Sequence, residues 1–174
     1  MAQRDGYTFD VPLGQDDRLV RLLAFAEDVL DTCASVCLSP VLDGSLAVLA
    51  YSRSPELVVG DVDFSLDRAH FSVLADALTR NGIFCEIQPW LVLQARRDDL
   101  KVEFGDTETW SQGMSEPFEQ VRLGDHIVRM INRGDLRISY ERGANALAAA
   151  PEELDKYTKI ANRLRLLEND SSIP

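Results

Sequence analysis

The spacing of apolar residues predicts helices towards both ends of the chain and strands in its middle. From Leu19 to Leu30, leucine, alanine and valine residues recur every three or four positions, which is the period of one helix face. The same period predicts a helix over 68–80. Elsewhere apolar residues alternate with polar ones or form short runs, a pattern typical of strands. The four predicted strands are 58–66, 83–88, 91–97 and 100–105.

The pattern predicts further helices before and after this region. The apolar run from Leu46 to Tyr51 predicts a short helix. Beyond residue 118 the chain is predicted to be mainly helical, and Pro151 suits the first position of the last helix. The buried stripe predicted for that helix consists of Leu154, Tyr157, Ala161 and Leu164.

This order of elements predicts an α+β fold in which helices flank one small mixed β-sheet. A chain of 174 residues is long enough for one domain with its own core. We therefore assign three consecutive segments to a single domain. They are an N-terminal arm and helix over 1–40, a sheet-containing core over 41–120 and a helical C-terminal part over 121–174.

The charge and the apolar runs of the chain exclude two classes of function. The net charge is −11, and residues 1–120 carry 21 acidic but only 9 basic side chains. Because phosphate groups repel such a chain, we expect no nonspecific binding to nucleic acid. Apolar runs are far shorter than a membrane span, and no signal sequence is recognisable. We therefore expect a cytoplasmic protein that does not contact a membrane.

A pair of aspartates in the strand predicted over 58–66 is the strongest chemical signal. Alternate side chains of a strand point to opposite faces, so Asp61 and Asp63 share one face, while Val62 and Phe64 face the core. Two adjacent carboxylates repel each other unless a cation lies between them. Carboxylate oxygens on a rigid strand suit Mg²⁺, which takes few protein ligands together with phosphate oxygens and water.

The strand predicted over 100–105 repeats this layout. Lys101 and Glu103 share its outer face, and the apolar residues between them face the core. If this strand lies beside the first, Glu103 joins Asp61 and Asp63 as a third carboxylate. Three carboxylates can hold two metal ions for in-line phosphoryl or nucleotidyl displacement, so we expect two Mg²⁺ ions.

Gly44 and Ser45 precede the short helix and are candidates for binding phosphate. Glycine lets the backbone approach a phosphate closely, and a helix N-terminus offers unpaired N–H groups. Without a ligand, the same pair would be an ordinary turn or helix cap. Arg53 and Lys101 are the candidate basic contacts for a nucleotide, with a solvated surface role as the alternative.

The Gly44-Ser45 turn, the Asp61-Val62-Asp63 strand and the later Glu103 resemble the signature of the nucleotidyltransferase (polymerase-β-like) superfamily. Within it, the chain is similar to a small bacterial branch of minimal nucleotidyltransferases and toxin-type proteins of abortive-infection (toxin-antitoxin) systems. The resemblance implies Mg²⁺-dependent transfer of a nucleoside monophosphate from a nucleoside triphosphate to an acceptor hydroxyl. It implies phosphate contacts for Gly44 and Ser45, metal binding by the two aspartates, and a third acidic role for Glu103. The acceptor would be a small molecule, a protein or a tRNA.

Two other hypotheses remain at the level of sequence. One is a catalytically inactive binding or regulatory protein with the same fold, and the other is an unrelated α+β protein whose acidic surface mimics the motif. Arg129, Arg133 and Arg137 recur at helical spacing, so they form either a solvated helix face or a phosphate contact. Trp90 and Trp110 either stack on a base or serve packing.

Overall fold

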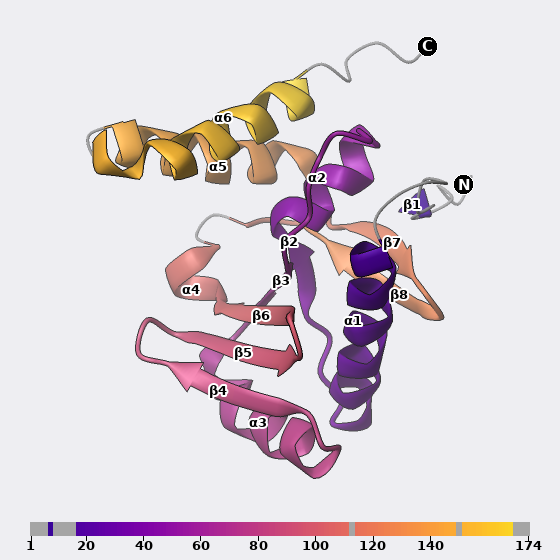
Figure 1. The fold of residues 1–174 in the computed structure, drawn as a ribbon. Coiled ribbons are helices and arrows are strands. Elements are labelled where there is room, and N and C mark those ends of the chain that lie inside the picture. Colours follow the sequence, from indigo (N-terminus) through magenta and orange to yellow (C-terminus); the bar gives the residue numbers. More distant parts are fainter. Residues whose placement is uncertain (1–6, 9–16, 112–113, 149–150, 169–174) are drawn as a thin grey trace.

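The computed structural model describes residues 7–8, 17–111, 114–148 and 151–168 (Figure 1). The strands are β1 (Tyr7–Thr8), β2 (Val41–Asp43), β3 (Val62–Leu66), β4 (Phe84–Gln88), β5 (Val92–Arg97), β6 (Leu100–Asp106), β7 (Glu119–Leu123) and β8 (His126–Met130). The helices are α1 (Asp17–Ser35), α2 (Gly44–Ser52), α3 (Phe71–Arg80), α4 (Thr107–Trp110), α5 (Arg133–Ala148) and α6 (Leu154–Glu168). Short 3-10 turns, Arg68–His70 and Pro151–Glu153, precede α3 and α6.

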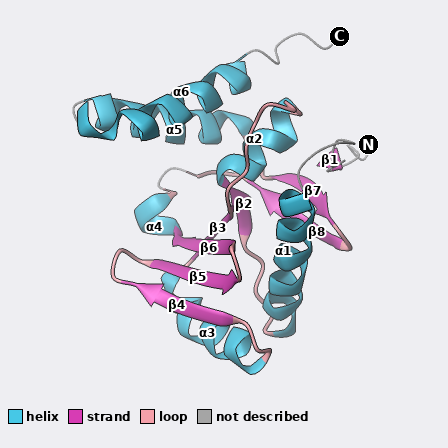
Figure 2. Ribbon diagram, viewed as in Figure 1, coloured by secondary structure: helices cyan, strands magenta, loops and turns pink. Residues whose placement is uncertain are grey.

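The described strands form one mixed sheet in the order β1-β7-β8-β2-β3-β6-β5-β4. Its central strand β3 runs parallel to β6 on one side and antiparallel to β2 on the other. Helices lie around this sheet, and α5 and α6 form a separate pair next to α2 (Figures 1 and 2). The predicted α+β architecture with a mixed sheet and helices at the C-terminal end is confirmed.

Alternation along β3 and β6 gives the sheet one apolar face. Val62, Phe64, Val102 and Phe104 are each at most 2% exposed. The rings of Phe64 and Phe104 lie opposite each other in the register and stack with centroids 5.4 Å apart. The apolar sides of α1 and α3 belong to the same core. Burial of this face therefore fixes β3 and β6 side by side and turns their polar residues to the other face.

The prediction of a mainly helical chain beyond residue 118 is wrong for β7 and β8. These strands form an antiparallel hairpin, joined at Gly124, which has a φ of +59°. Val121 and Leu123 on one strand and Val128 on the other are buried in the sheet. Alternating apolar residues around a Gly-Asp turn are a hairpin signal, and burial of the alternating face prevails here over the helical spacing of the arginines.

The C-terminal helices differ from the prediction in their burial. Leu154 is 65% exposed and Tyr157 is 38% exposed, so the predicted stripe is wrong over the first turns of α6. The buried residue of α6 is Leu167 near its end, where the Arg133 guanidinium donates to the Leu167 carbonyl oxygen. Helix α6 packs on α5 and α2 rather than on the sheet, which leaves its outer side to solvent. Arg129 lies on β8, so it does not share a helix face with Arg133.

None of the described helices is long and apolar enough to cross a membrane.

Candidate active site

A row of polar side chains crosses the sheet on the face opposite the apolar core. In the strand register, Asp43 of β2 lies opposite Asp63 of β3, and Asp63 lies opposite Glu103 of β6. Gln94 of β5 continues the row beyond Glu103 and donates a hydrogen bond to its Oε1. Because pairing between strands sets this row, the backbone itself holds the carboxylates together.

The three carboxylates predicted from the sequence converge at one point. Ligand oxygens of Asp61, Asp63 and Glu103 all lie within 4.8 Å of one another. The side chains of Asp61 and Glu103 are 27% and 19% exposed, so solvent reaches the group from one side. This geometry is suited to a hard divalent cation that keeps part of its shell for water or phosphate.

Lys101 lies inside this acidic group. Its ammonium contacts Asp61 Oδ2 at 3.2 Å and Glu103 Oε1 at 3.1 Å. Burial alone would lower the pKa of Lys101, but the two carboxylates outweigh burial and raise the pKa above its usual value. Lys101 is therefore charged, and it neutralises part of the repulsion between Asp61 and Glu103.

Asp63 is held in an unfavourable environment for a negative charge. Burial is the largest cause that raises the pKa of Asp63 well above its usual value, and the neighbouring Asp61, Glu103 and Asp43 raise it further. The positive charge of Arg163 acts in the opposite direction. A carboxyl whose charged form is disfavoured in this way gains most from a bound cation.

The turn into α2 packs directly on Asp63. Gly44 has a φ of +67°, and a Cβ built on it would lie 2.8 Å from the Cβ of Asp63. A larger residue is therefore excluded both by the left-handed backbone and by the neighbouring side chain. Asp43 caps this helix by accepting the Gly44 N–H at 2.7 Å. The N-terminus of α2 thus opens beside the carboxylate cluster.

Asp43 is a fourth carboxylate of this region, and it was not among the predicted site residues. Its Oδ2 accepts hydrogen bonds from Ser111 at 3.1 Å and from Ser65 at 3.4 Å, and the two hydroxyls also contact each other. Burial raises the pKa of Asp43, against the lowering effect of these hydrogen bonds and of the Gly44 N–H. A plain N-cap pattern marks Asp43 in the sequence, but its position beside Asp63 depends on the β2–β3 register.

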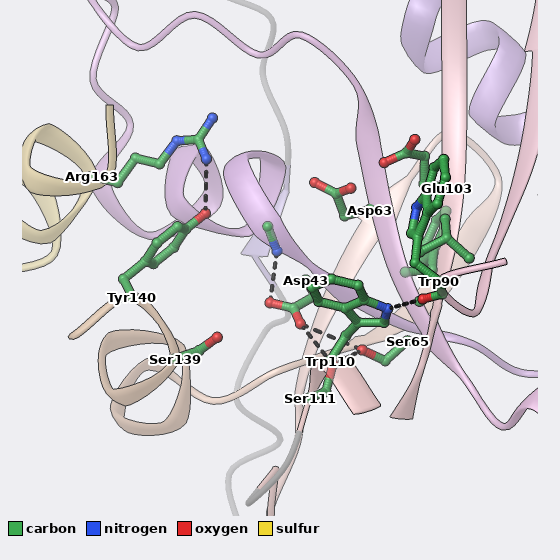
Figure 3. Close-up of a pocket in the computed structure, with 14 residues that line it drawn as sticks. Asp43, Asp63, Ser65, Trp90, Glu103, Trp110, Ser111, Ser139, Tyr140 and Arg163 are labelled. Atoms are coloured by element: carbon green, nitrogen blue, oxygen red, sulfur yellow. Dashed lines mark hydrogen bonds between the residues drawn. The ribbon is translucent and has the colours of Figure 1, made fainter. Parts of the chain in front are cut away.

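A cavity of about 360 Å³ lies over the row of carboxylates. Asp43 and Asp63 lie between its two walls (Figure 3). One wall carries Tyr140 and Arg163 from the C-terminal helices, and the other carries Glu103 and Trp90, with Trp110 across the opening between them. The cavity thus brings acidic, basic and aromatic side chains from distant parts of the sequence to one place.

Arg163 is the basic residue of the cavity, and sequence reasoning missed it. It donates to the Tyr140 hydroxyl at 3.5 Å, and its guanidinium lies over the Tyr140 ring. Burial raises the pKa of Tyr140, so its hydroxyl stays protonated at neutral pH. Arg163 also lines a neighbouring cleft with Asp61 and Lys159. The i, i+4 spacing of Lys159 and Arg163 was a signal for a basic helix face.

Arg53 lies at the other end of α2 from Gly44. It is the exposed C-cap residue of this helix, with a φ of +49°, and it is not among the residues that line the cavity. A helix of nine residues spans about 13 Å, which separates the Arg53 backbone from the carboxylates by that order of distance. Lys101, in contrast, contacts the carboxylates of Asp61 and Glu103. The structure therefore brings together six of the seven predicted site residues, and Arg53 is the exception.

Solved structures of several other proteins have a fold similar to that of this chain. The chain is similar to the antibiotic-resistance factor ANT(2'')-Ia, with a TM-score of 0.65 and 16% identity over 85% of this chain and 83% of that one. It is also similar to a nucleotidyltransferase-like antigenic protein from Paracoccidioides brasiliensis, with a TM-score of 0.59 and 12% identity over 85% and 73% of the two chains. The chain has the nucleotidyltransferase fold. The lincosamide antibiotic adenylyltransferase LnuA, bound to lincomycin, matches with a TM-score of 0.51 and 12% identity over 86% of this chain and 96% of that one.

These likenesses concern the fold, since the identities are low. No protein-family model and no curated protein sequence matches the chain. Adenylyltransferases are among the structures with this fold. In this chain, the carboxylates of Asp61, Asp63 and Glu103 lie close enough together to hold a metal ion.

The residues of this nucleotidyltransferase fold fit a divalent cation and a phosphate. Asp61, Asp63 and Glu103 supply only oxygen ligands, the donor set that Mg²⁺ prefers. Among the described residues, the Ser45 hydroxyl is the buried side-chain polar atom without a hydrogen-bond partner. Buried polar groups are nearly always paired, so this hydroxyl on the first turn of α2 points to a missing acceptor such as a phosphate oxygen.

Proposed function

We propose that the protein transfers a nucleoside monophosphate from a nucleoside triphosphate to an acceptor hydroxyl with the help of Mg²⁺. The observation that carries this proposal is the convergence of Asp61, Asp63 and Glu103 beside the Gly44-Ser45 turn. Three oxygen ligands and a glycine-led helix N-terminus are the two parts that a metal-bound triphosphate requires. The low-identity fold matches support the same activity without showing it.

Some residues that line the cavity, and others directly beside it, have defined tasks in this reaction. The N–H groups of the first turn of α2, together with the Ser45 hydroxyl and Arg163, hold the triphosphate. Asp61, Asp63 and Glu103 would hold two Mg²⁺ ions, and bound Mg²⁺ would polarise the α-phosphate and stabilise the leaving oxygen. Gln94 orients Glu103 by donating to its Oε1.

The transfer step balances with these groups alone. The acceptor oxygen forms a bond to the α-phosphorus while the bond from that phosphorus to the bridging oxygen breaks, and pyrophosphate leaves. Because Oε1 of Glu103 already accepts from Gln94 and Lys101, we assign Oε2 as the atom that receives the proton of the acceptor hydroxyl. Arg163 and the helix N-terminus retain the pyrophosphate charge as it develops.

Transfer of label tests the proposal. Nucleoside triphosphates labelled at the α- or the γ-phosphate are incubated with the protein, Mg²⁺ and fractions of small molecules, proteins and tRNA from a cell extract. The α-label is expected in a new product and the γ-label in pyrophosphate, and both signals are expected to vanish in Asp61→Asn. Movement of the γ-phosphate to the acceptor would show a kinase instead and would overturn the proposal.

A second candidate function is a catalytically inactive nucleotide-binding or regulatory protein. The observation in its favour is Lys101, whose ammonium contacts two of the three carboxylates. The positive charge of Lys101 offsets part of the negative charge of the carboxylates, which reduces the need for a metal ion between them. Mg²⁺-dependent nucleotide binding without label transfer to any acceptor fraction would support this second function.

Ser45→Ala is expected to weaken the binding of nucleotide without lowering the stability of the protein. Because the buried hydroxyl has no partner, its removal is expected to leave the free energy of unfolding unchanged or raise it by up to about 1 kcal/mol. Loss of a hydrogen bond to a charged phosphate is expected to weaken Mg²⁺–nucleotide binding about 10-fold. Denaturant unfolding and calorimetry measure the two quantities. A stability loss with unchanged affinity would show that Ser45 is only structural.

Lys101→Met is expected to tighten the binding of divalent cations about 5-fold. The substitution keeps most of the side-chain volume and removes the ammonium that competes for Asp61 and Glu103. Titration of Mn²⁺ by electron paramagnetic resonance measures the affinity. Lys156→Met is the matched control and should change nothing, because it breaks an ion pair between Lys156 on α6 and Glu153 in the preceding 3-10 turn. Weaker Mn²⁺ binding in Lys101→Met would mean that Lys101 supports the metal site.

Three finer predictions from the sequence stay predictions. The toxin-type branch of abortive-infection systems rests on the resemblance alone. The cytoplasmic location rests on the absence of a recognisable signal sequence and of a membrane-length apolar run, and the expectation of two Mg²⁺ ions rests on the three carboxylates. The acceptor is open among a small molecule, a protein and a tRNA, and the cavity itself bears on this choice.

A further inference from the structure

The two tryptophans of the chain both lie at the mouth of the cavity. Trp90 is 54% exposed and Trp110 is 53% exposed, and both line the cavity over the carboxylates. The sequence contains no other tryptophan. Large aromatic side chains are usually buried in part by their own fold, so half-exposed indoles beside a polar cavity indicate a ligand with an apolar face.

The position of Trp110 is fixed before any ligand binds. Its indole N–H donates to the Trp90 carbonyl oxygen at 2.9 Å, and its side chain lies against Gly105, where a Cβ would come within 3.3 Å. Asp106 caps the short helix α4 by accepting the Thr109 N–H and hydroxyl. The indole is therefore a rigid surface, which lowers the entropic cost of binding a ring.

The backbone of Trp90 is held by the same group of contacts. It lies in the turn between β4 and β5, next to Leu91, which has a φ of +62°. The Leu91 carbonyl oxygen accepts the N–H of Asp106, so this turn is tied to the start of α4. A branched residue in the left-handed region is strained, and the contact with Asp106 keeps it there.

Trp90 lies on the side of the cavity away from Arg163, and Trp110 lies between the two walls (Figure 3). Arg163 lies on one wall, and Glu103 and Trp90 lie on the opposite wall, with Asp63 between them (Figure 3). In an in-line displacement the attacking oxygen approaches opposite the leaving pyrophosphate. With the pyrophosphate held near Arg163, the acceptor hydroxyl must therefore come from the side of Glu103 and Trp90.

We propose that Trp90 and Trp110 form the acceptor subsite, and that the acceptor is an uncharged or cationic small molecule with a hydroxyl-bearing ring that stacks on the two indoles. This inference rests on the proposed nucleotidyl transfer. A sugar or an aromatic ring offers the required apolar face. Asp43, Asp63 and Glu103 line the same cavity, which disfavours an acceptor with a negative charge near the ring.

The first test separates an acceptor subsite from a nucleobase subsite. Binding of Mg²⁺ with a non-hydrolysable α,β-methylene triphosphate is measured by calorimetry for the wild type, Trp90→Ala and Trp110→Ala. We expect affinities within about 2-fold of one another. A loss of about 5-fold or more, the lower end for a base stacked on an aromatic side chain, would place the nucleobase on the tryptophans and overturn the inference. Absence of binding in the wild type would instead overturn the proposed function.

The second test uses the tryptophan emission, which reports on these two residues alone. The complex with the same analogue is titrated with methyl glucoside as a sugar ring and with tyramine as a cationic aromatic ring. Glucuronate serves as the anionic sugar, and glycerol as the polyol without a ring. We expect a shift of emission to shorter wavelength with at least one of the first two probes and none with the last two. Equal responses to glycerol, or none to either ring, would overturn the inference.

Matched variants complete the test. Trp110→Phe keeps an aromatic face and should retain most of the affinity for the responding probe, whereas Trp110→Ala should lose about 5-fold or more. Phe84→Ala removes an aromatic residue that is 64% exposed on β4 but does not line the cavity, and it should have no effect. An equal loss in Phe84→Ala and Trp110→Ala would mean that the probes bind elsewhere.

Discussion

Asp63→Asn is expected to lower nucleotidyl transfer by more than about 100-fold and to raise the melting temperature of the metal-free protein by about 2 °C or more. Mutation of groups that merely support metal ligands costs about 10–100-fold, so loss of a ligand should cost more. The stability gain follows from burial and from the three neighbouring carboxylates, which together raise the pKa of Asp63. An uncharged amide of the same shape removes that repulsion.

The stability gain should depend on pH with a defined sign. The pKa of Asp63 in the folded protein lies well above the value of about 3.9 for an unfolded chain, so the folded state holds the proton more tightly. The contribution of Asp63 to stability is therefore present below about pH 4 and is lost as the pH rises through its folded-state pKa. The difference between Asp63→Asn and the wild type should be largest at neutral pH and vanish near pH 4.

Thermal unfolding with a chelator present, followed from pH 4 to pH 8, measures this difference. Asp76→Asn, an exposed aspartate on α3, is the control and should show no comparable trend. If Asp63→Asn were less stable than the wild type at neutral pH, a partner would have to stabilise the Asp63 carboxylate. The claim that its neighbours repel its negative charge would then be wrong.

Gly44→Ala is expected to abolish Mg²⁺–nucleotide binding and to destabilise the fold by at least about 2 kcal/mol. The left-handed backbone at Gly44 costs a non-glycine residue about 1–3 kcal/mol. In addition, the new methyl group would overlap the side chain of Asp63, so either Asp63 or the start of α2 must move. Either movement separates the metal ligands from the phosphate contacts.

Gly82→Ala provides the matched control for backbone strain. Gly82 has a φ of +73°, close to that of Gly44, but no atom lies within 4 Å of the position that a Cβ would take. We expect it to lose about 1 kcal/mol in urea unfolding and to bind Mg²⁺–nucleotide as the wild type does. If the two alanine variants were equally stable and both bound nucleotide, the tight packing of Gly44 on Asp63 would play no part in function.

The local chemistry of the site could be predicted because it depends on short-range periodicity. Alternation along one strand predicted that Asp61 and Asp63 share a face, and the same rule predicted Lys101 beside Glu103. In the structure β3 begins at Val62 rather than at residue 58, so Asp61 directly precedes the strand, and its carboxylate still lies close to that of Asp63. The sequence-based prediction needed one further assumption, that the two strands are neighbours. The parallel pairing of Val62 with Val102 and of Asp63 with Glu103 supplies this link.

Contacts between distant elements could not be predicted in this way. Arg163 reaches the cavity because α6 packs on α2, and nothing in the local pattern of α6 indicates that partner. Asp43 becomes part of the acidic row through its register with Asp63. The β7–β8 hairpin carried a local signal at its Gly-Asp turn, but the helical spacing of Arg129 and Arg133 obscured it.

The location of a bound cation can be determined directly by anomalous diffraction from Mn²⁺. Crystals grown with Mn²⁺ and a non-hydrolysable nucleoside triphosphate analogue should show an anomalous peak coordinated by Asp61 and Asp63. The phosphate chain should extend from that peak to the first turn of α2 and Ser45. A nucleotide bound away from this turn, or a Mn²⁺ peak that contacts none of the three carboxylates, would contradict the proposed site.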